Sequence, residues 1–208
     1  MFADDVAAAL DGCAAAVMIP KFVPGPHADL AMRALAEIES AWDLGAPTPV
    51  IGLIESAAGV LALAQPFTLP DGVVRLAFGA ADYYADLGLP YQSSGTHTEL
   101  AMATLVLACA AAGLPSPVAS PHFSPGDHTG LVSVSKHARG LGFGGGLCIH
   151  PDQIGAVNAL FRISNDERSW AHRVIDAWED PASRTKGAIT VDGALVDEAM
   201  VRHARSIL

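Results

Sequence analysis

The chain has 208 residues, of which 51% are hydrophobic and 16% charged, and its formal net charge is −10. This composition predicts a folded domain with a sizeable core, and the acidic balance disfavours nucleic acid and anionic membranes as partners. Every apolar run is shorter than the roughly 18 residues of a membrane helix. The acidic start (Asp4, Asp5) and three scattered cysteines lead us to expect a cytoplasmic protein.

Apolar segments alternate with helical patterns along most of the chain. The expected strands are residues 13–21, 50–54, 73–78, 116–120 and 147–150. The expected helices are residues 4–10, 29–42, 57–65, 99–112, 131–139 and 153–178, the last broken near 163–165. This alternation predicts an α/β fold with a parallel sheet, in which polar residues at the strand ends share one edge.

A short terminal segment follows the last of these helices. The sequence predicts a linker at residues 181–187 and an extended segment at 188–191. A turn at 192–193 and a helix at 196–208 are expected to follow. We therefore expect an α/β domain at 1–180 and a separate C-terminal segment at 181–208.

Two carboxylates stand just past consecutive buried strands. Glu55 ends the segment PVIGLIE, and Asp82 ends LAFGAAD, 27 residues later. This spacing suits a strand, a helix and the next strand, so that both carboxylates would reach the same sheet edge. Two hard oxygen ligands, with other positions left to water and substrate, are a typical way of holding Mg²⁺.

Structural alternatives exist for each of these polar residues. Glu55 and Asp82 could instead stabilise the first turns of helices, and Asp197 could cap the final helix. Lys21, which ends the first strand, could pair with Glu55 as a structural cation or bind substrate. His150, which precedes a proline, could hydrogen-bond its own turn.

Three segments together resemble the citrate lyase β-subunit branch of the 2-hydroxyacid aldolase superfamily. They are LIESAAGV (53–60), LAFGAADYYADLG (76–88) and LGFGGGLCIHPDQI (141–154), supported by VMIPK (17–21) and ITVDGALVD (189–197). The resemblance covers nearly the whole chain.

The resemblance implies a (β/α)₈ TIM barrel, usually trimeric, that uses Mg²⁺ to cleave C–C bonds in citryl-, malyl- or citramalyl-CoA. Glu55 and Asp82 match the metal ligands, and Glu55 also lies against the substrate. Gly79, Ala80 and Ala81 match the loop that receives the substrate carboxylate. His150 and Pro151 match a turn near coenzyme A. Asp197 matches an acid/base on a C-terminal lid that reaches a neighbouring subunit.

The sequence departs from the family pattern in several places. The first three strands of the pattern, with an Arg that binds the substrate carboxylate, are not found, so that we expect a truncated barrel of about five β-α units plus the lid. Gly146 stands where the pattern has Lys, and Val118 where it has Asp.

We therefore expect a Mg²⁺-dependent C–C lyase that acts on a short 3-hydroxyacyl-CoA and forms a homo-oligomer, with a trimer favoured. Two alternatives are a non-catalytic remnant that binds CoA or a partner, and a metal-dependent aldolase acting on a free 2-keto acid. The missing Arg favours the remnant, whereas the set Glu55, Asp82 and Asp197 favours the enzyme.

Overall fold

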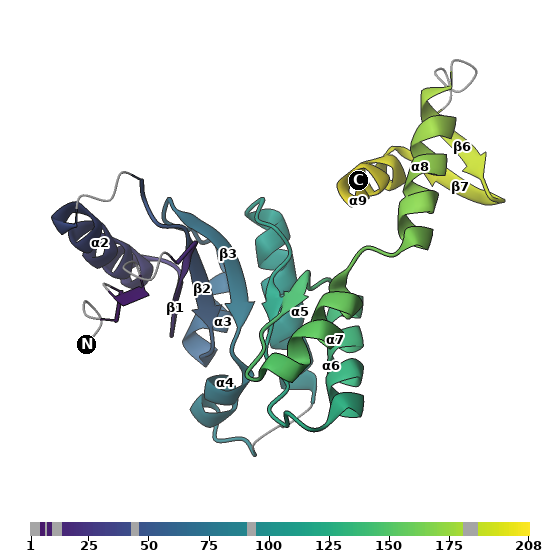
Figure 1. Cartoon of the computed structure of the whole chain (residues 1–208). Helices are drawn as coiled ribbons and strands as arrows, with labels where there is room; N and C mark the ends of the chain where they lie inside the picture. The colour runs from purple at the N-terminus through teal and green to yellow at the C-terminus, as the bar shows by residue number, and fades with distance from the viewer. Residues whose placement is uncertain (1–4, 7, 10–13, 43–45, 91–94, 181–186) are drawn as a thin grey trace. The chain divides into compact units, whose positions relative to one another are not determined.

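The computed structural model describes residues 5–6, 8–9, 14–42, 46–90, 95–180 and 187–208 (Figure 1). Contacts divide the chain into two compact units, Met1–Phe161 and Arg162–Leu208. Of the helix expected at 4–10, residues 5, 6, 8 and 9 are described and helical, whereas residues 4, 7 and 10 and most of the linker expected at 181–187 lie outside the described residues.

Unit 1 is built on a parallel sheet whose strands follow one another in chain order. The strands are β1 (Val17–Ile19), β2 (Val50–Ile54), β3 (Val73–Phe78), β4 (Val118–Ala119) and β5 (Gly145–Gly146). The prediction of a parallel α/β sheet is confirmed, and β2 and β3 have the predicted bounds. Doubly wound sheets reverse their strand order at a switch point, whereas this order runs consecutively from β1 to β5.

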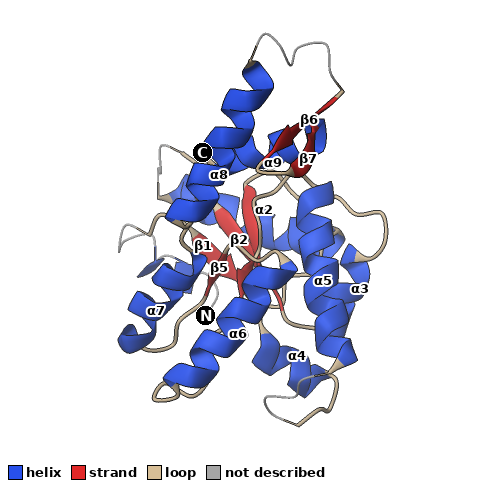
Figure 2. Cartoon of the chain, turned by 90° about the vertical axis from the view of Figure 1, so that its right-hand side faces the viewer, coloured by secondary structure: helices blue, strands red, loops and turns tan. Residues whose placement is uncertain are grey.

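Helices connect the strands and surround them in Figure 2. They are α2 (Pro26–Ala41), α3 (Ala57–Leu63), α4 (Ala80–Asp86), α5 (Thr96–Ala111), α6 (His128–Leu141) and α7 (Pro151–Phe161). Of these, α4 was not expected as a helix. Among the described residues, none of the helices has both the length and the apolar character that crossing a bilayer requires.

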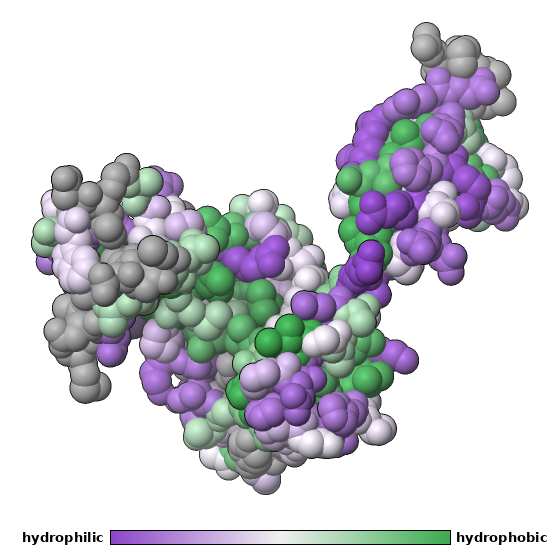
Figure 3. Space-filling model, viewed as in Figure 1, coloured by the Kyte–Doolittle hydropathy of each residue, from purple (hydrophilic) through white to green (hydrophobic). Residues whose placement is uncertain are grey.

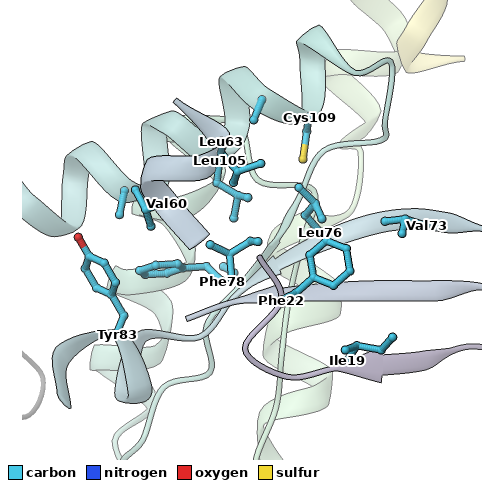
Figure 4. Packing of buried hydrophobic residues seen from close by; sticks show 14 of the residues in the cluster. Ile19, Phe22, Val60, Leu63, Val73, Leu76, Phe78, Tyr83, Leu105 and Cys109 are labelled. Atoms are coloured by element: carbon cyan, nitrogen blue, oxygen red, sulfur yellow. The ribbon is translucent and has the colours of Figure 1, made fainter. Parts of the chain in front are cut away.

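The main core lies between the sheet and α5. Leu105 and Cys109 on α5 face Leu76 and Phe78 on β3, and Phe22 packs beside them (Figure 4). Burial raises the pKa of the Cys109 thiol to about 11, so that this cysteine stays neutral and acts as a small apolar core residue.

The opposite face of the sheet is apolar but more open. Met18, Ile51 and Leu53 alternate along β1 and β2 with buried residues, because successive side chains of a strand point to opposite faces. Figure 3 shows hydrophobic residues gathered over the region where Figure 1 draws β2 and β3.

The last strand does not lie where we predicted it. Instead of 147–150, the paired residues are Gly145 and Gly146, which align with Val118 and Ala119. A Cβ on Gly146 would lie 3.3 Å from Val157 of α7, so that a small residue lets the helix lie close to the strand. Pairing continues only to the Leu147 N–H, which donates to the Ala119 carbonyl (2.9 Å), and the chain then turns into α7.

Unit 2 is a helix–hairpin–helix unit with its own core. It comprises α8 (Asn165–Glu179), β6 (Ala188–Val191), β7 (Ala194–Asp197) and α9 (Glu198–Ile207). Val174 of α8, Val196 of β7 and Val201 of α9 are almost fully buried together. Because α8 shares this core, the unit begins at Arg162 and not at the expected residue 181.

The final helix also begins later than we predicted. Residues 194–197 form a strand antiparallel to β6, and the helix begins at Glu198 and not at residue 196. Asp192 and Gly193 both have positive φ (51° and 80°), which suits a two-residue hairpin turn. The predicted break near 163–165 is confirmed, with Ser164 capping α8.

We expect Gly52→Ala to lower the free energy of unfolding by about 1–3 kcal/mol, because it overpacks the core. The added Cβ would lie 2.7 Å from the buried Phe22 ring and 3.0 Å from Leu76. Gly155→Ala is the matched control, since Gly155 lies exposed within α7 with nothing near its Cβ position. The control should be stabilised by about 0.5–1 kcal/mol. Urea unfolding of both variants measures this, and equal effects would contradict the packing described here.

Candidate functional site

The carboxyl ends of β2 and β3 bring the predicted acids together. Ile54 and Phe78 pair in register, and the Gly79 N–H donates to the Ile54 carbonyl (2.9 Å). Glu55 follows β2 directly, and Asp82 lies in the first turn of α4, directly after β3. The sheet edge predicted from their spacing is therefore the edge at which both side chains lie.

Glu55 is buried, with 6% of its surface exposed. Its Oε1 accepts a hydrogen bond from the Lys21 backbone N–H (2.8 Å). A Cβ on Gly79 would lie 2.6 Å from Oε2 of Glu55, so that only glycine at this position leaves room for the carboxylate.

The ionised form of Glu55 is unfavourable in its buried position. Burial raises the pKa of this carboxyl above its ordinary value, and the negative charge of Asp82 raises it further. The hydrogen bond from the Lys21 N–H acts in the opposite direction. Asp82 therefore lies close enough for its charge to act on Glu55.

Lys21 contacts both acids, although not as expected. Its ammonium lies 3.1 Å from Oδ1 of Asp82, and only its backbone N–H reaches Glu55. The side chains of Lys21 and Asp82 are 70% and 52% exposed, so that the ion pair is open to solvent. The hydrogen bond to Asp82 raises the pKa of Lys21, which keeps the ammonium charged.

The donor set fits a magnesium ion. Glu55 and Asp82 are hard oxygen donors that both contact Lys21, Glu55 through its backbone N–H and Asp82 through its ammonium, and Asp82 faces solvent. Mg²⁺ commonly takes one or two carboxylates and keeps several waters or substrate oxygens. Within the described part of the chain, no three His, Cys, Asp or Glu side chains form a closed metal-binding group. The arrangement therefore suits an open, two-carboxylate site.

The segment expected to be a carboxylate-binding loop is different in the structure. Ala80 and Ala81 begin α4, and Gly79 is its N-cap. The Gly79 N–H is directed to Ile54, and the Ala80 N–H donates to Oγ of Ser120 (3.1 Å). A substrate carboxylate could use these two N–H groups only by replacing their present acceptors.

Neighbouring polar residues support the edge. Asp86 accepts a hydrogen bond from the Ala57 N–H (2.8 Å) and so joins α4 to α3. Ser120, which the sequence interpretation missed, joins the end of β4 to the start of α4. A serine directly before a proline and after an apolar segment was the available signal.

His150 and Pro151 lie where the chain enters α7. Pro151 begins the helix, and Nδ1 of His150 accepts a hydrogen bond from the Asp152 N–H (3.3 Å), so that the imidazole supports its own turn. A second residue missed in the sequence is the fully buried Gln153. Its amide donates to the His122 carbonyl (2.7 Å) and accepts from the Ile149 N–H (3.0 Å), which joins two loops.

Asp197 belongs to unit 2, where it acts as a helix cap. Its Oδ1 accepts a hydrogen bond from the Met200 N–H (3.1 Å) at the start of α9. The structural alternative considered for this residue is thus present, and a catalytic role would have to coexist with it.

A family model described as HpcH/HpaI aldolase/citrate lyase matches residues 1–151. A citrate lyase subunit beta-like protein of Deinococcus radiodurans is 29% identical over 192 residues, covering 92% of this chain and 65% of that protein. An L-malyl-CoA/beta-methylmalyl-CoA lyase of Cereibacter sphaeroides is also 29% identical, with the same coverages of 92% and 65%. The chain thus spans just under two thirds of the length of these curated relatives.

The fold is similar to that of solved structures. Protein CitE from Mycobacterium tuberculosis, in complex with magnesium, acetoacetate and coenzyme A, superposes with a TM-score of 0.71 at 28% identity. The match covers 99% of this chain and 71% of that one.

We expect Glu55→Gln to raise the free energy of unfolding at pH 7 in the presence of a chelator. A carboxyl whose pKa is raised by folding contributes stability below its ordinary pKa of 4.5, and this contribution is lost as pH rises through the folded-state value. The neutral amide avoids this loss. The advantage of the variant should therefore grow from acid toward neutral pH in thermal unfolding scans. A variant less stable than the wild type at pH 7 would contradict this account of Glu55.

Proposed function

Because the chain belongs to the HpcH/HpaI aldolase/citrate lyase family, we propose that it carries the metal site of a carbon–carbon lyase acting on a short 3-hydroxyacyl-CoA thioester. Citryl-, malyl- and citramalyl-CoA are the candidate substrates, and acetyl-CoA is the expected product. The observation that carries the proposal is that Glu55 and Asp82, at the ends of neighbouring parallel strands, lie at one sheet edge and both contact the same residue, Lys21. The relatives named as lyases support the reaction class.

Glu55 and Asp82 would hold Mg²⁺, in keeping with the magnesium and coenzyme A bound to the relative from M. tuberculosis. Bound there, the ion would supply Lewis-acid polarisation of the substrate hydroxyl and of the carbonyl formed from it. Lys21 would bind the substrate carboxylate through its exposed ammonium. His150 and Pro151, at the entry to α7, would lie near the CoA portion of the substrate.

Asp197 is proposed as the acid/base that transfers a proton at the enolate carbon of the acetyl-CoA fragment. In this proposal it works in the site of a neighbouring subunit, on a C-terminal lid. Its Oδ1 is engaged in capping α9, and a carboxylate has a second oxygen with which to exchange a proton.

The five strands are proposed to form part of a (β/α)₈ barrel. Their consecutive order is the order of a barrel and differs from that of a doubly wound sheet. The open apolar face with Met18, Ile51 and Leu53 corresponds in this proposal to the barrel interior, which packed side chains normally fill.

We also propose a homo-oligomer, with a trimer favoured by the resemblance. The helix α5 carries apolar residues on its outer side as well as its inner side, and Leu100 and Leu107 are 65% and 71% exposed. A helix that is apolar all round is normally covered on all sides, and a neighbouring subunit would provide that cover.

The first test is Mg²⁺-dependent release of acetyl-CoA from malyl-, citramalyl- and citryl-CoA. Asp82→Asn should reduce turnover by at least about 100-fold, since even groups that only orient metal ligands cost 10- to 100-fold. Asp176→Asn makes the same change on the exposed side of α8 and should leave turnover unchanged. Turnover insensitive to both chelator and Asp82→Asn would refute the metal site. A folded chain without any turnover would favour the non-catalytic alternative.

Asp197→Asn separates catalysis from capping. Asparagine caps helices about as well as aspartate, so the stability should change by less than about 0.5 kcal/mol. Loss of the acid/base should lower turnover by about 100- to 10,000-fold. Asp197→Ala, which removes the cap as well, should also cost about 1 kcal/mol of stability. Full activity in Asp197→Asn would leave Asp197 with the structural role alone.

A further inference from the structure

The backbone of Lys21 has an unusual conformation. Its φ is +48°, and among the described residues only Lys21 and Asp192 combine a positive φ with a side chain. This left-handed region is unfavourable for a lysine, which has no short polar side chain to stabilise it locally. Such strain persists where the surrounding structure requires it, and it often accompanies function.

The conformation allows a single residue to contact both acids. The N–H of Lys21 donates to Oε1 of Glu55 (2.8 Å), while the ammonium at the end of the same side chain lies 3.1 Å from Oδ1 of Asp82. The next residue, Phe22, is buried, and its N–H donates to the Leu53 carbonyl (3.0 Å), which anchors the turn to β2. The position of Lys21 beside the acids is thus fixed through its backbone.

The ammonium and a metal ion would need the same carboxylate. A divalent cation bound to Asp82 would meet the positive charge of Lys21 at close range, and like charges at that distance repel each other. The backbone hydrogen bond to Glu55 does not conflict with the ion in this way, because it leaves Oε2 of Glu55 unaffected.

We propose that Lys21 is a built-in competitor for the cation site: its ammonium neutralises Asp82 in the metal-free protein and leaves it when Mg²⁺ binds. This inference rests on the proposed metal site. It adds that the chain sets its own metal affinity below what the two acids alone would provide. The long lysine side chain, mostly in solvent, can move away without disturbing the backbone turn.

Direct binding of Mn²⁺ to the full chain, measured by electron paramagnetic resonance with Mg²⁺ as competitor, tests the proposal without activity. Lys21→Met removes the charge but keeps a side chain of nearly the same length. This variant should bind Mn²⁺ about fivefold more tightly, which corresponds to the upper end of the energy of an exposed charge pair. Lys21→Arg retains the charge and should stay within twofold of the wild type. The gain in Mn²⁺ affinity of Lys21→Met should shrink at high ionic strength, because salt screens the charge of Lys21 in the wild type. Lys21→Gln serves as the second charge-free variant if Lys21→Met does not fold.

The outcomes distinguish the competitor role of Lys21 from the metal site itself. Tighter binding by the charge-free variants, with Lys21→Arg unchanged, supports the competitor role. Unchanged or weaker binding by a folded charge-free variant overturns that role and leaves the metal site intact, because a purely structural lysine would weaken the site when removed. Two results would overturn the metal site and the competitor role together. One is that neither the wild type nor any folded Lys21 variant binds Mn²⁺. The other is that Asp82→Asn does not weaken the binding of Mn²⁺.

Discussion

The parallel pairing of Ile54 with Phe78 is the constraint from which the site follows. Because this pair is in register, Glu55 leaves β2 at the level where Gly79 leaves β3, and α4 then presents Asp82 beside it. A slip of one residue would exchange the two faces of a strand and move Glu55 away from Gly79. The same pairing buries Ile54 and Phe78 in the main core, so that packing and site geometry depend on one register.

Much of this edge could be predicted because local signals agree. The apolar runs of β2 and β3 are bounded by Pro49 and by the turn Pro70-Asp71-Gly72, and both strands have the predicted bounds. A strand-helix-strand spacing then predicts the shared edge of Glu55 and Asp82.

Other features depend on partners distant in sequence. Gly145 and Gly146 do not look like a strand, yet they pair with β4, and at Gly146 the lack of a side chain lets α7 lie close. The strand β7 exists because β6 lies across a two-residue turn, whereas its own residues also fit the start of a helix. The contact between Lys21 and Asp82 depends on a left-handed residue that lysine itself does not signal. Such features are tertiary, and composition and periodicity carry little information about them.

The close approach of Gly79 to Glu55 has a consequence for the way this protein can evolve. Any side chain at position 79 would collide with the carboxylate, so the two positions cannot change independently. A lineage that keeps the glutamate must keep the glycine, and because a Cβ at 79 would also lie 2.7 Å from the Cβ of Glu55, only a lineage with glycine at 55 gains room for alanine at 79. Once residue 79 has a side chain, regaining the glutamate requires a prior reversal to glycine. The order of substitutions at this pair therefore acts as a ratchet, which makes loss of the carboxylate easier than its recovery.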